Sequence, residues 1–230
     1  MATRYDRQRM LPEIGEQGQK RLSEARVLIV GAGGLGSPIS TYLTGAGVGT
    51  IGIMDDDLVS ITNLQRQILY SEAQEGSPKV ECAKERLSAL NSTIRINTYQ
   101  FRATPETLSG LLPDYDIIVD ATDNFNSRYE LSDACAAAHK PLVHGAIHAL
   151  EGCVAVLCVG HATFRTLYPD KEQTLSMPHP GRAVVGVTPA IVGSVQASQV
   201  IQLICGYGEP LIDRLWTIDL RNMQSYIIEL

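Results

Sequence analysis

The apolar residues of the first 150 positions fall into short hydrophobic runs that alternate with longer segments of mixed polarity. The short runs are typical of buried strands, and the segments between them are typical of helices. Strands and helices that alternate in this way form parallel sheets joined by right-handed crossovers. The sequence therefore predicts an α/β fold with a mostly parallel sheet and helices on both faces. The predicted strands are residues 26–31, 50–55, 94–99, 116–120 and a run beginning at 141–144, and the predicted helices are residues 37–46, 78–90, 105–112 and 126–139.

The pattern changes after about residue 150, where strands are no longer followed by helices. A polar, proline-rich stretch predicts a mobile loop, and a long run of small and apolar residues predicts a helix that packs on a neighbour or a second subunit. We expect antiparallel strands here, within one domain over residues 1–230 that has two parts, about 1–150 and about 151–230. The predicted elements are a strand at 152–159, a loop at 169–182, a helix at 188–205 and a hairpin of strands at 215–219 and 224–229.

Composition narrows the classes of protein to which this chain can belong. Hydrophobic residues make up 44% of the 230 positions and charged residues 19%, which is typical of folded globular proteins. The formal net charge is −6 with no Lys- or Arg-rich run, which argues against a nucleic-acid partner. No apolar run approaches the roughly 20 residues of a membrane span, and the polar N-terminus lacks a signal-peptide core. We therefore expect no membrane partner and a cytoplasmic location, in line with five scattered cysteines and no C-x-x-C pair.

A glycine-dense turn follows the first predicted strand and precedes the first predicted helix. The sequence VLIVGAGGLG contains Gly31, Gly33 and Gly36 at the G-x-G-x-x-G spacing of dinucleotide-binding turns, with Gly34 as an additional glycine. Glycines let backbone N–H groups approach a ligand, and the N-terminus of a helix favours negative charge. The turn therefore predicts a site for a nucleotide phosphate, although a glycine turn that only packs a helix on a sheet can have the same spacing.

Three acidic residues end the second predicted strand. Asp55 stands where an acidic side chain hydrogen-bonds ribose hydroxyls in nucleotide-binding folds, and Asp56 and Asp57 crowd the same turn. Three adjacent carboxylates repel one another unless a cation lies near them. The turn therefore predicts a ribose contact at Asp55 and a nearby Arg, Lys or metal ion.

The segment NLQRQ and a lysine after it form a polar cluster that a dehydrogenase does not need. Arg66 can bridge phosphate oxygens through two hydrogen bonds, and Asn63 and Gln67 can donate neutral hydrogen bonds beside it. Lys79 opens a predicted helix, where its ammonium group can reach a phosphate. Each residue alone is equally well explained as a surface polar group, but together they predict a triphosphate.

An acidic loop, DATDN, follows the fourth predicted strand. In an open sheet of order 3-2-1-4-5 the first and fourth strands flank the crevice where ligands bind, so we expect Asp123 to face the glycine turn. A carboxylate beside a triphosphate commonly holds Mg²⁺. Alternatively, Asp123, Asn124 or Asn126 caps the next helix, and this alternative stays open at this point.

The segments described so far occur in the same order in a known family. RYDRQ, VLIVGAGGLGSP, DDDLVSITNLQRQILY, ATDNFNSRY, PLVHGAI and GSVQASQ resemble the bacterial MoeB/ThiF/HesA proteins, which are relatives of the ubiquitin-activating enzymes. The resemblance covers nearly the whole chain. It implies a Rossmann-like sheet whose first part, about residues 1–150, binds the nucleotide, an antiparallel C-terminal part and a homodimer.

The resemblance also implies an activity. Such enzymes use ATP and Mg²⁺ to adenylate the C-terminal Gly-Gly carboxylate of a small ubiquitin-like sulfur carrier, similar to ThiS or MoaD, and release pyrophosphate. The activated carrier serves sulfur transfer in thiamine, molybdopterin or related biosynthesis. No general base is required, because a carboxylate is already deprotonated at neutral pH. The resemblance assigns Gly34 to the nucleotide, Asp55 to the ribose, Asn63, Arg66 and Lys79 to the phosphates, Asp123 to Mg²⁺ and Arg7 to the partner subunit's site, and its matched segments include Asp57 and Gln67.

The chain departs from the family pattern at three places. Relatives often hold a structural zinc with two C-x-x-C pairs, but Thr163 and Thr166 stand at the first pair and the sequence ends at Leu230 before the second. Some relatives carry a cysteine in the loop before the long helix, whereas residues 171–182 contain none and His179 stands near that place. We therefore expect no zinc and no covalent cysteine step on this loop.

Three other functions stay open at this point. A non-catalytic scaffold has no reason to keep the polar set described above, and an NAD(P)-dependent oxidoreductase has no need of NLQRQ and the lysine. The same adenylation of another substrate, a peptide C-terminus or a tRNA base, is a third alternative, and the acidic net charge weakens the tRNA version. His144 and His148, beside the fifth predicted strand, are expected to be structural or to line a pocket.

Overall fold

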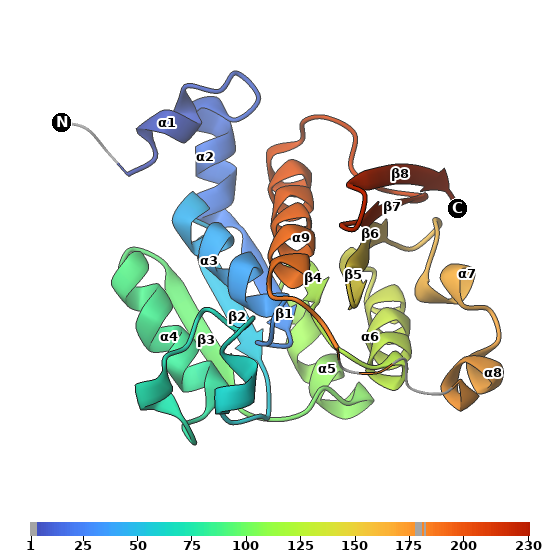
Figure 1. Ribbon diagram of the computed structural model, residues 1–230. Helices are drawn as coiled ribbons and strands as arrows, with labels where there is room; N and C mark the ends of the chain where they lie inside the picture. Colours follow the sequence, from blue (N-terminus) through green and yellow to red (C-terminus); the bar gives the residue numbers. More distant parts are fainter. Residues whose placement is uncertain (1–3, 178–180, 182) are drawn as a thin grey trace.

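In the computed structural model, which describes residues 4–177, 181 and 183–230, eight strands form one sheet of order β3-β2-β1-β4-β5-β6-β7-β8 (Figure 1). The first five strands of the chain pair in parallel, and β6, β7 and β8 are added in antiparallel fashion. The predicted order 3-2-1-4-5 and the mixed sheet are therefore confirmed. The strands are β1 Arg26–Val30, β2 Thr50–Met54, β3 Arg95–Tyr99, β4 Ile117–Asp120, β5 Leu142–His148, β6 Glu151–Leu157, β7 Arg214–Asp219 and β8 Gln224–Glu229.

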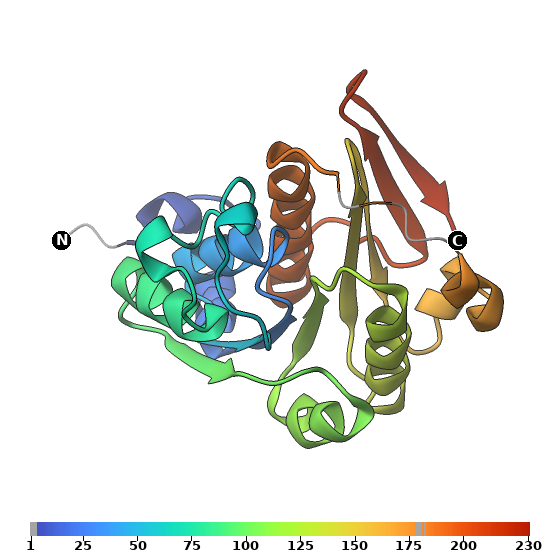
Figure 2. The same cartoon turned by 60° about the horizontal axis from the view of Figure 1, so that its bottom comes forward.

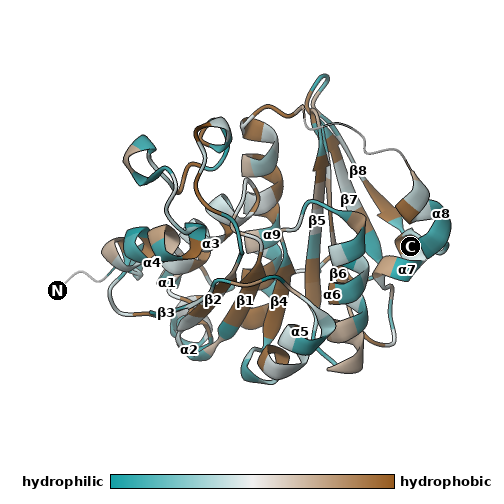
Figure 3. Cartoon of the chain, turned by 90° about the horizontal axis from the view of Figure 1, so that it is seen from below, coloured by the Kyte–Doolittle hydropathy of each residue, from teal (hydrophilic) through white to brown (hydrophobic). Residues whose placement is uncertain are grey.

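Helices cover both faces of the sheet and enclose two apolar layers. Buried residues of α2, α3, α4 and α9 form one layer, and those of α5, α6 and α7 form the other. Figure 3 shows that the central strands between these layers are hydrophobic, whereas α8 at the edge is hydrophilic. The helices are α1 Asp6–Arg9, α2 Gly15–Glu24, α3 Gly36–Ala46, α4 Lys79–Leu90, α5 Pro105–Leu111, α6 Phe125–Ala137, α7 Phe164–Leu167, α8 Lys171–Ser176 and α9 Val187–Cys205, with short 3-10 helices η1 Ile61–Asn63, η2 Glu72–Gln74 and η3 Leu112–Asp114.

Capping residues in the sequence mark the end of α3 and the start of α6, the two helices beside the ligand crevice. Helix α3 ends at Gly47, whose φ of 85° is the left-handed conformation that glycine adopts without strain. Helix α6 begins after Asn124, whose side chain accepts a hydrogen bond from the backbone N–H of Ser127. Of the three residues that could have capped α6, Asn124 is thus the cap, which leaves the carboxylate of Asp123 available.

Four helices, α1, α2, α7 and α8, lie outside the helices that the sequence predicted, and the reason is clearest for α2 and α8. Helix α2 lies before the first predicted strand, where no helix was predicted, and α8 lies inside the loop expected at 169–182. In α2, Gly18 packs against Cys205 of α9, and this close contact between helices stabilises a segment whose own glycines disfavour a helix. Helix α8 is capped by Asp170, whose side chain accepts from the N–H of Gln173. Both helices depend on contacts or caps that hydrophobic periodicity does not show.

Helix α9 is long and apolar enough to cross a membrane by length and composition, contrary to the expectation that no segment approaches that length. It is a core helix of this fold: it packs on α3 and across β5 and β6. Its buried side chains include Gln196 and Gln199, which hydrogen-bond backbone groups of other segments. Core helices of soluble proteins also meet these criteria of length and composition, so α9 is only weak evidence that the chain crosses a membrane.

The C-terminal hairpin projects from the body of the molecule (Figure 2). Strand β8 is exposed along its whole length, including Tyr226, Ile227 and Ile228, and it forms one edge of the sheet. Exposed apolar residues on an edge strand are typical of a surface that another protein chain covers.

Candidate active site

The glycine turn lies at the carboxyl end of β1, beside the carboxyl end of β4, as the strand order predicted. Gly31 has a φ of 103°, and a Cβ there would lie 2.5 Å from the carbonyl oxygen of Ala121, so only glycine fits. Gly36 begins α3 and packs directly on the carbonyl group of Gly31. In the first turn of α3, Ser37 and Ile39 already donate their N–H groups to the carbonyl oxygens of Gly33 and Leu35, and Pro38 has no N–H, so backbone donors for an anion have to come from the glycine turn before them.

Asp55 ties the end of β2 to the glycine turn. Its carboxylate accepts hydrogen bonds from the backbone N–H of Ala32 at 2.7 Å and of Asp57 at 2.9 Å. Burial raises the pKa of the Asp55 carboxyl group, and the nearby charge of Lys79 offsets part of that rise. The predicted ribose-binding residue therefore also holds the phosphate turn in place.

Tyr70 holds the other side of the same turn, a role that the sequence analysis missed. Its hydroxyl group donates a hydrogen bond of 2.7 Å to the carbonyl oxygen of Ala32. The side chain is buried, and burial together with the charge of Asp55 raises the pKa of the phenol. Tyr70 follows NLQRQ by three residues, after the apolar Ile68 and Leu69.

Lys79 is the cation that the three adjacent carboxylates predicted. It begins α4, its side chain is 3% exposed, and its ammonium nitrogen lies 2.8 Å from Asp57 Oδ2 and 4.0 Å from Asp55 Oδ1. Carboxylate oxygens of Asp55, Asp56 and Asp57 lie within 4.8 Å of one another, close enough for a metal ion. Because the ammonium group of Lys79 already pairs with two of them, this cluster does not need an ion to balance its charge.

The NLQRQ segment lies against the glycine turn, as predicted. A Cβ on Gly34 would meet the Arg66 side chain at 3.5 Å, and one on Gly33 would meet Gln67 Nε2 at 3.5 Å. Asn63 ends η1, and its carbonyl oxygen accepts from the N–H groups of both Arg66 and Gln67, which fixes the direction of the segment. The structure therefore brings Asn63, Arg66 and Gln67 together with the glycines.

Two polar groups of this segment remain available to a ligand. Gln67 is buried, and within the described part of the chain its amide oxygen has no hydrogen-bond partner. Arg66 is partly buried, and its guanidinium group makes one hydrogen bond of 3.2 Å, to the carbonyl oxygen of Thr62. A buried amide oxygen without a partner costs free energy that a hydroxyl or amino donor from a ligand would recover.

The N-terminus of α9 closes the outer side of the glycine turn, which the sequence did not indicate. A Cβ on Gly34 would lie 3.1 Å from the side chain of Pro189. Gly186 packs directly on the backbone of Gln65 and Arg66. The crevice is thus bounded by the long helix as well as by the strands.

Asp123 lies in the loop after β4 with an exposed side chain. Its carboxylate accepts a hydrogen bond of 3.3 Å from the amide of Asn124. Strand β4 neighbours β1, and Ala121 touches Gly31, so the loop that carries Asp123 borders the glycine turn. The predicted position across the crevice is therefore consistent with the structure.

Arg7 is the one predicted site residue that lies far from the others. It is exposed on α1, next to Gln8, whose amide donates to the carbonyl oxygen of Ala46 at the C-terminal end of α3. The glycine turn is at the opposite end of α3, about 16 Å away for a helix of this length. Figure 1 shows α1 at the upper end of the molecule and the segment around residues 60–75 at the lower end. Within one chain, Arg7 does not reach the crevice.

The sequence pattern of the ThiF family matches residues 5–230 of this chain. The chain belongs to the ThiF family. Its 43% identity to the sulfur carrier protein adenylyltransferase of Thermus thermophilus extends over 94% of this chain and 82% of that protein. It is 41% identical to the probable adenylyltransferase/sulfurtransferase MoeZ of Mycobacterium tuberculosis, over 96% of this chain but only 58% of MoeZ.

Solved structures agree with the ThiF-type fold. The crystal structure of Escherichia coli MccB with ATP superposes with a TM-score of 0.85 at 25% identity, over all of this chain and 72% of that one. A structure of PaaA gives a TM-score of 0.83 at 25% identity, over 98% of this chain and 72% of PaaA. The eight-stranded mixed sheet with its helices is thus a known architecture for this family.

Proposed function

We propose that this chain is an ATP-dependent adenylyltransferase that activates the C-terminal Gly-Gly carboxylate of a small ubiquitin-like sulfur carrier. The observation that supports this proposal most strongly is the meeting of three segments at one sheet edge. The glycine turn, the NLQRQ segment and the loop of Asp123 all lie around the carboxyl ends of β1 and β4. This is the switch point at which open parallel sheets bind nucleotides.

The residues of the crevice fit ATP. The turn at Gly34 leaves no Cβ between the backbone and a phosphate, and it lies at the N-terminal end of α3, where negative charge is favoured. Arg66 supplies a positive charge for phosphate oxygens, and the partnerless amide oxygen of Gln67 fits a donor on the nucleotide. The carboxylate of Asp55, partly exposed at the turn, takes the ribose hydroxyl groups.

The proposed reaction joins two anions. A carboxylate oxygen of the carrier attacks the α-phosphorus of ATP, the bond from that phosphorus to the pyrophosphate oxygen breaks, and pyrophosphate leaves. The protein's task is therefore to hold both groups in line and to stabilise the negative charge. Asn63, Arg66 and Lys79 serve the phosphates, although Lys79 must then share its ammonium group with Asp57.

The proposed metal ion is Mg²⁺ at Asp123. Hard oxygen ligands suit Mg²⁺, and it usually combines one or two carboxylates with phosphate oxygens and water. Asp123 is exposed, and α6 is capped by Asn124 instead, so its carboxylate is available. The ion would neutralise phosphate charge beside the glycine turn.

The proposed assembly is a homodimer in which Arg7 completes the partner's site. Arg7 is exposed and too far from its own crevice to act there. Met10 and Leu11 beside it are 72% and 50% exposed, which suits a surface covered by another subunit. If sites are shared, mixing an Arg7→Ala chain with an Arg66→Ala chain restores part of the activity lost in each; no recovery in proven hybrid dimers would contradict it.

The remaining parts of the proposal concern zinc, pathway and location. Thr163 and Thr166 form a capping box at α7, and their hydroxyl groups are poor zinc ligands, so no zinc is proposed. The sulfur carrier would serve thiamine, molybdopterin or related biosynthesis in the cytoplasm, without a nucleic-acid or membrane partner. His179 of the loop 171–182 lies outside the described residues.

The test is carrier-dependent exchange of radioactive pyrophosphate into ATP with a Gly-Gly-ended carrier. We expect Arg66→Ala and Asp123→Ala each to lower exchange about 100-fold or more, as expected when one electrostatic contact to a reacting group is lost. The matched control is Arg86→Ala on the exposed side of α4, which should exchange like wild type. Wild-type exchange in either site variant would refute the assignment of that residue.

A further inference from the structure

A completely buried aspartate at the end of β4 holds the start of the loop that carries Asp123. Asp120 is 0% exposed, and its Oδ2 lies 2.7 Å from Nδ1 of His144 on β5. Its Oδ1 accepts from the backbone N–H of Thr122 at 3.0 Å and from the hydroxyl group of Thr122 at 2.7 Å. A carboxylate removed from water requires donors on its oxygens, so Thr122 is tied to the end of β4 by two hydrogen bonds.

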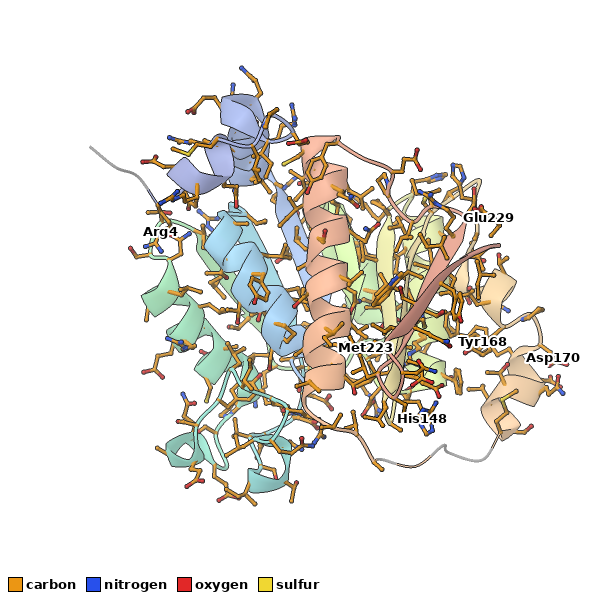
Figure 4. The ribbon with its side chains drawn as sticks, turned by 45° about the horizontal axis from the view of Figure 1, so that its top comes forward. Arg4, His148, Tyr168, Asp170, Met223 and Glu229 are labelled. Carbon is orange, nitrogen blue, oxygen red and sulfur yellow. The ribbon has the colours of Figure 1, made fainter. Side chains whose placement is uncertain are left out.

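Side chains on both faces of the sheet enclose this aspartate. On the face of α9, the amide of Gln196 donates to the backbone carbonyl oxygen of Asp120 at 2.8 Å. On the other face, Phe164 packs edge-on to His144 with ring centres 5.2 Å apart. Tyr168, which Figure 4 shows on the side of α7 and α8, packs on Phe164 in turn. Water is thus kept away from Asp120, and its protein partners are hard to replace.

The first turns of α6 hold the same loop from its other end. Arg128 is 9% exposed and donates a hydrogen bond of 3.0 Å to the carbonyl oxygen of Thr122. Asn124 caps α6, and its amide donates to the carboxylate of Asp123 at 3.3 Å. The residues directly before and after Asp123 are therefore both fixed, whereas the side chain of Asp123 itself is exposed.

Charge strengthens the tie between Asp120 and Thr122. Burial alone would raise the pKa of the Asp120 carboxyl group, but the hydrogen bond and charge of His144, the charge of Arg128 and the hydroxyl group of Thr122 lower it. Asp120 is therefore ionised at neutral pH. An ionised acceptor makes stronger hydrogen bonds than a neutral one, so this turn is held more firmly than an ordinary turn.

The tied loop lies directly against the phosphate turn. Ala121 donates its N–H to the carbonyl oxygen of Val30 at 2.9 Å. The carbonyl oxygen of Ala121 lies 2.5 Å from the place of a Cβ on Gly31. Because Ala121 is fixed on β1 and Thr122 on β4, the backbone gives Asp123 little freedom to turn away from the crevice.

We propose that Thr122 and Arg128 are positioning residues that hold the carboxylate of Asp123 in place for the metal ion of the ATP site. This inference rests on the proposed function, in which Asp123 binds Mg²⁺. Mg²⁺ requires near-ideal octahedral geometry, so a carboxylate whose direction is fixed beforehand binds it more tightly than one on a free loop. Groups that orient a metal ligand typically account for about 10- to 100-fold in metal affinity.

The variants follow from the two bonds of Thr122. Thr122→Val removes the hydroxyl donor and keeps the shape of the side chain, whereas Thr122→Ser keeps the donor. Thr93→Val is the matched control, because Thr93 makes the same pair of bonds to Asn91 Oδ1, from its N–H at 3.2 Å and its hydroxyl group at 2.8 Å. Thr93 precedes β3, at the edge of the sheet opposite to the crevice. Arg128→Met removes the second tie.

The first measurement needs neither nucleotide nor metal. Amide hydrogen–deuterium exchange, followed by mass spectrometry of the peptide that contains residues 121–124, reports how firmly the loop is held. We expect this peptide to exchange about 10-fold faster in Thr122→Val and in Arg128→Met, because a hydrogen bond to a charged or buried partner is lost. Thr122→Ser and Thr93→Val should exchange there like wild type. Unchanged protection of this peptide in Thr122→Val would overturn the proposal.

The second measurement is ATP binding by calorimetry, in EDTA and in Mg²⁺. Thr122→Val and Arg128→Met should bind ATP like wild type in EDTA but about 10-fold more weakly in Mg²⁺, with Asp123→Ala as the reference for a lost metal ligand. Thr122→Ser and Thr93→Val should bind like wild type in both, because general destabilisation does not depend on the metal. If Mg²⁺ tightens ATP binding equally in wild type and Thr122→Val, this inference alone is overturned. If wild type binds no ATP, the proposed function fails and this inference fails with it.

Discussion

Alanine substitutions at three glycines give the sharpest test of the glycine turn. An added Cβ can clash with a neighbour and can strain a backbone of positive φ, and the three glycines combine these two effects differently. In Gly31→Ala the new Cβ lies 2.5 Å from the carbonyl oxygen of Ala121, at a φ of 103°. Gly160 has a φ of 84° but open space, so Gly160→Ala introduces the backbone strain without the clash. Gly45 has open space and an ordinary φ, so Gly45→Ala introduces neither.

The expected loss of stability follows from these two contributions. A residue with a side chain at positive φ costs about 1–2 kcal/mol. An ordinary carbon–oxygen contact is about 3.3 Å, so the backbone at Gly31 must give way by about 0.8 Å, and such overpacking costs about 1–3 kcal/mol. We expect Gly31→Ala to lose about 2–5 kcal/mol, Gly160→Ala about 1–2, and Gly45→Ala to gain up to about 1.

Urea unfolding followed by circular dichroism measures the free energies, and pyrophosphate exchange measures the site. A domain of ordinary stability keeps Gly31→Ala folded in buffer, so exchange can be measured on folded protein. A shift of nearly 1 Å in the phosphate turn should lower exchange about 100-fold. The two control variants should exchange like wild type, because neither glycine touches the crevice.

If Gly31→Ala is no less stable than Gly160→Ala, the clash with the carbonyl oxygen of Ala121 is absent and the proposed tight fit at Gly31 is refuted. A Gly31→Ala variant that unfolds at lower urea concentration but exchanges pyrophosphate at the wild-type rate would refute the proposed role of the turn. In that case the turn at Gly31 contributes to stability and does not position the nucleotide.

Three further predictions concern ionisable groups and metal. Lys79→Met leaves the carboxylates of Asp55 and Asp57 without their cation. Breaking a fully buried ion pair costs about 3–5 kcal/mol, but Asp57 is largely exposed, so we expect the free energy of unfolding in urea to fall by about 2–3 kcal/mol. Unchanged stability would contradict the ion pair. His144 has a raised pKa, so its contribution is complete below about pH 6.5 and is lost as pH rises through the raised value, while the lowered pKa of Asp120 keeps its contribution above about pH 4. The stability gap between wild type and His144→Gln should therefore be larger at pH 5.5 than at pH 9, and a gap that widens with pH would refute the assignment. Metal analysis of the purified protein should find no stoichiometric zinc, and about one zinc per chain would overturn the argument from Thr163 and Thr166.

Local pattern predicted most of the nucleotide-binding part. Buried strands and the glycine turn are encoded by adjacent residues, so the order of β1 to β5 and the extent of α3 were predictable. The carboxyl ends of parallel strands meet at one edge, which is why Asp55 and the loop of Asp123 could be placed near Gly31.

Pairing between distant side chains was not predictable in the same way. A cation beside Asp55, Asp56 and Asp57 was predicted without saying which residue supplies it, and it is Lys79, 22 positions from Asp57. Tyr70 was not singled out, yet it holds the carbonyl group of Ala32. Such contacts depend on how loops return to the sheet, which hydrophobic periodicity does not describe.

The sequence by itself thus determined the strand order, the phosphate turn and the polar residues that border it. Only the tertiary structure decided that Arg7 lies at the wrong end of α3 for its own crevice, and that His144 of β5 reaches Asp120 while Arg128 of α6 reaches Thr122. The physical reason is that sequence patterns specify which face of an element is buried, whereas register and the packing of layers decide which side chains meet on that face.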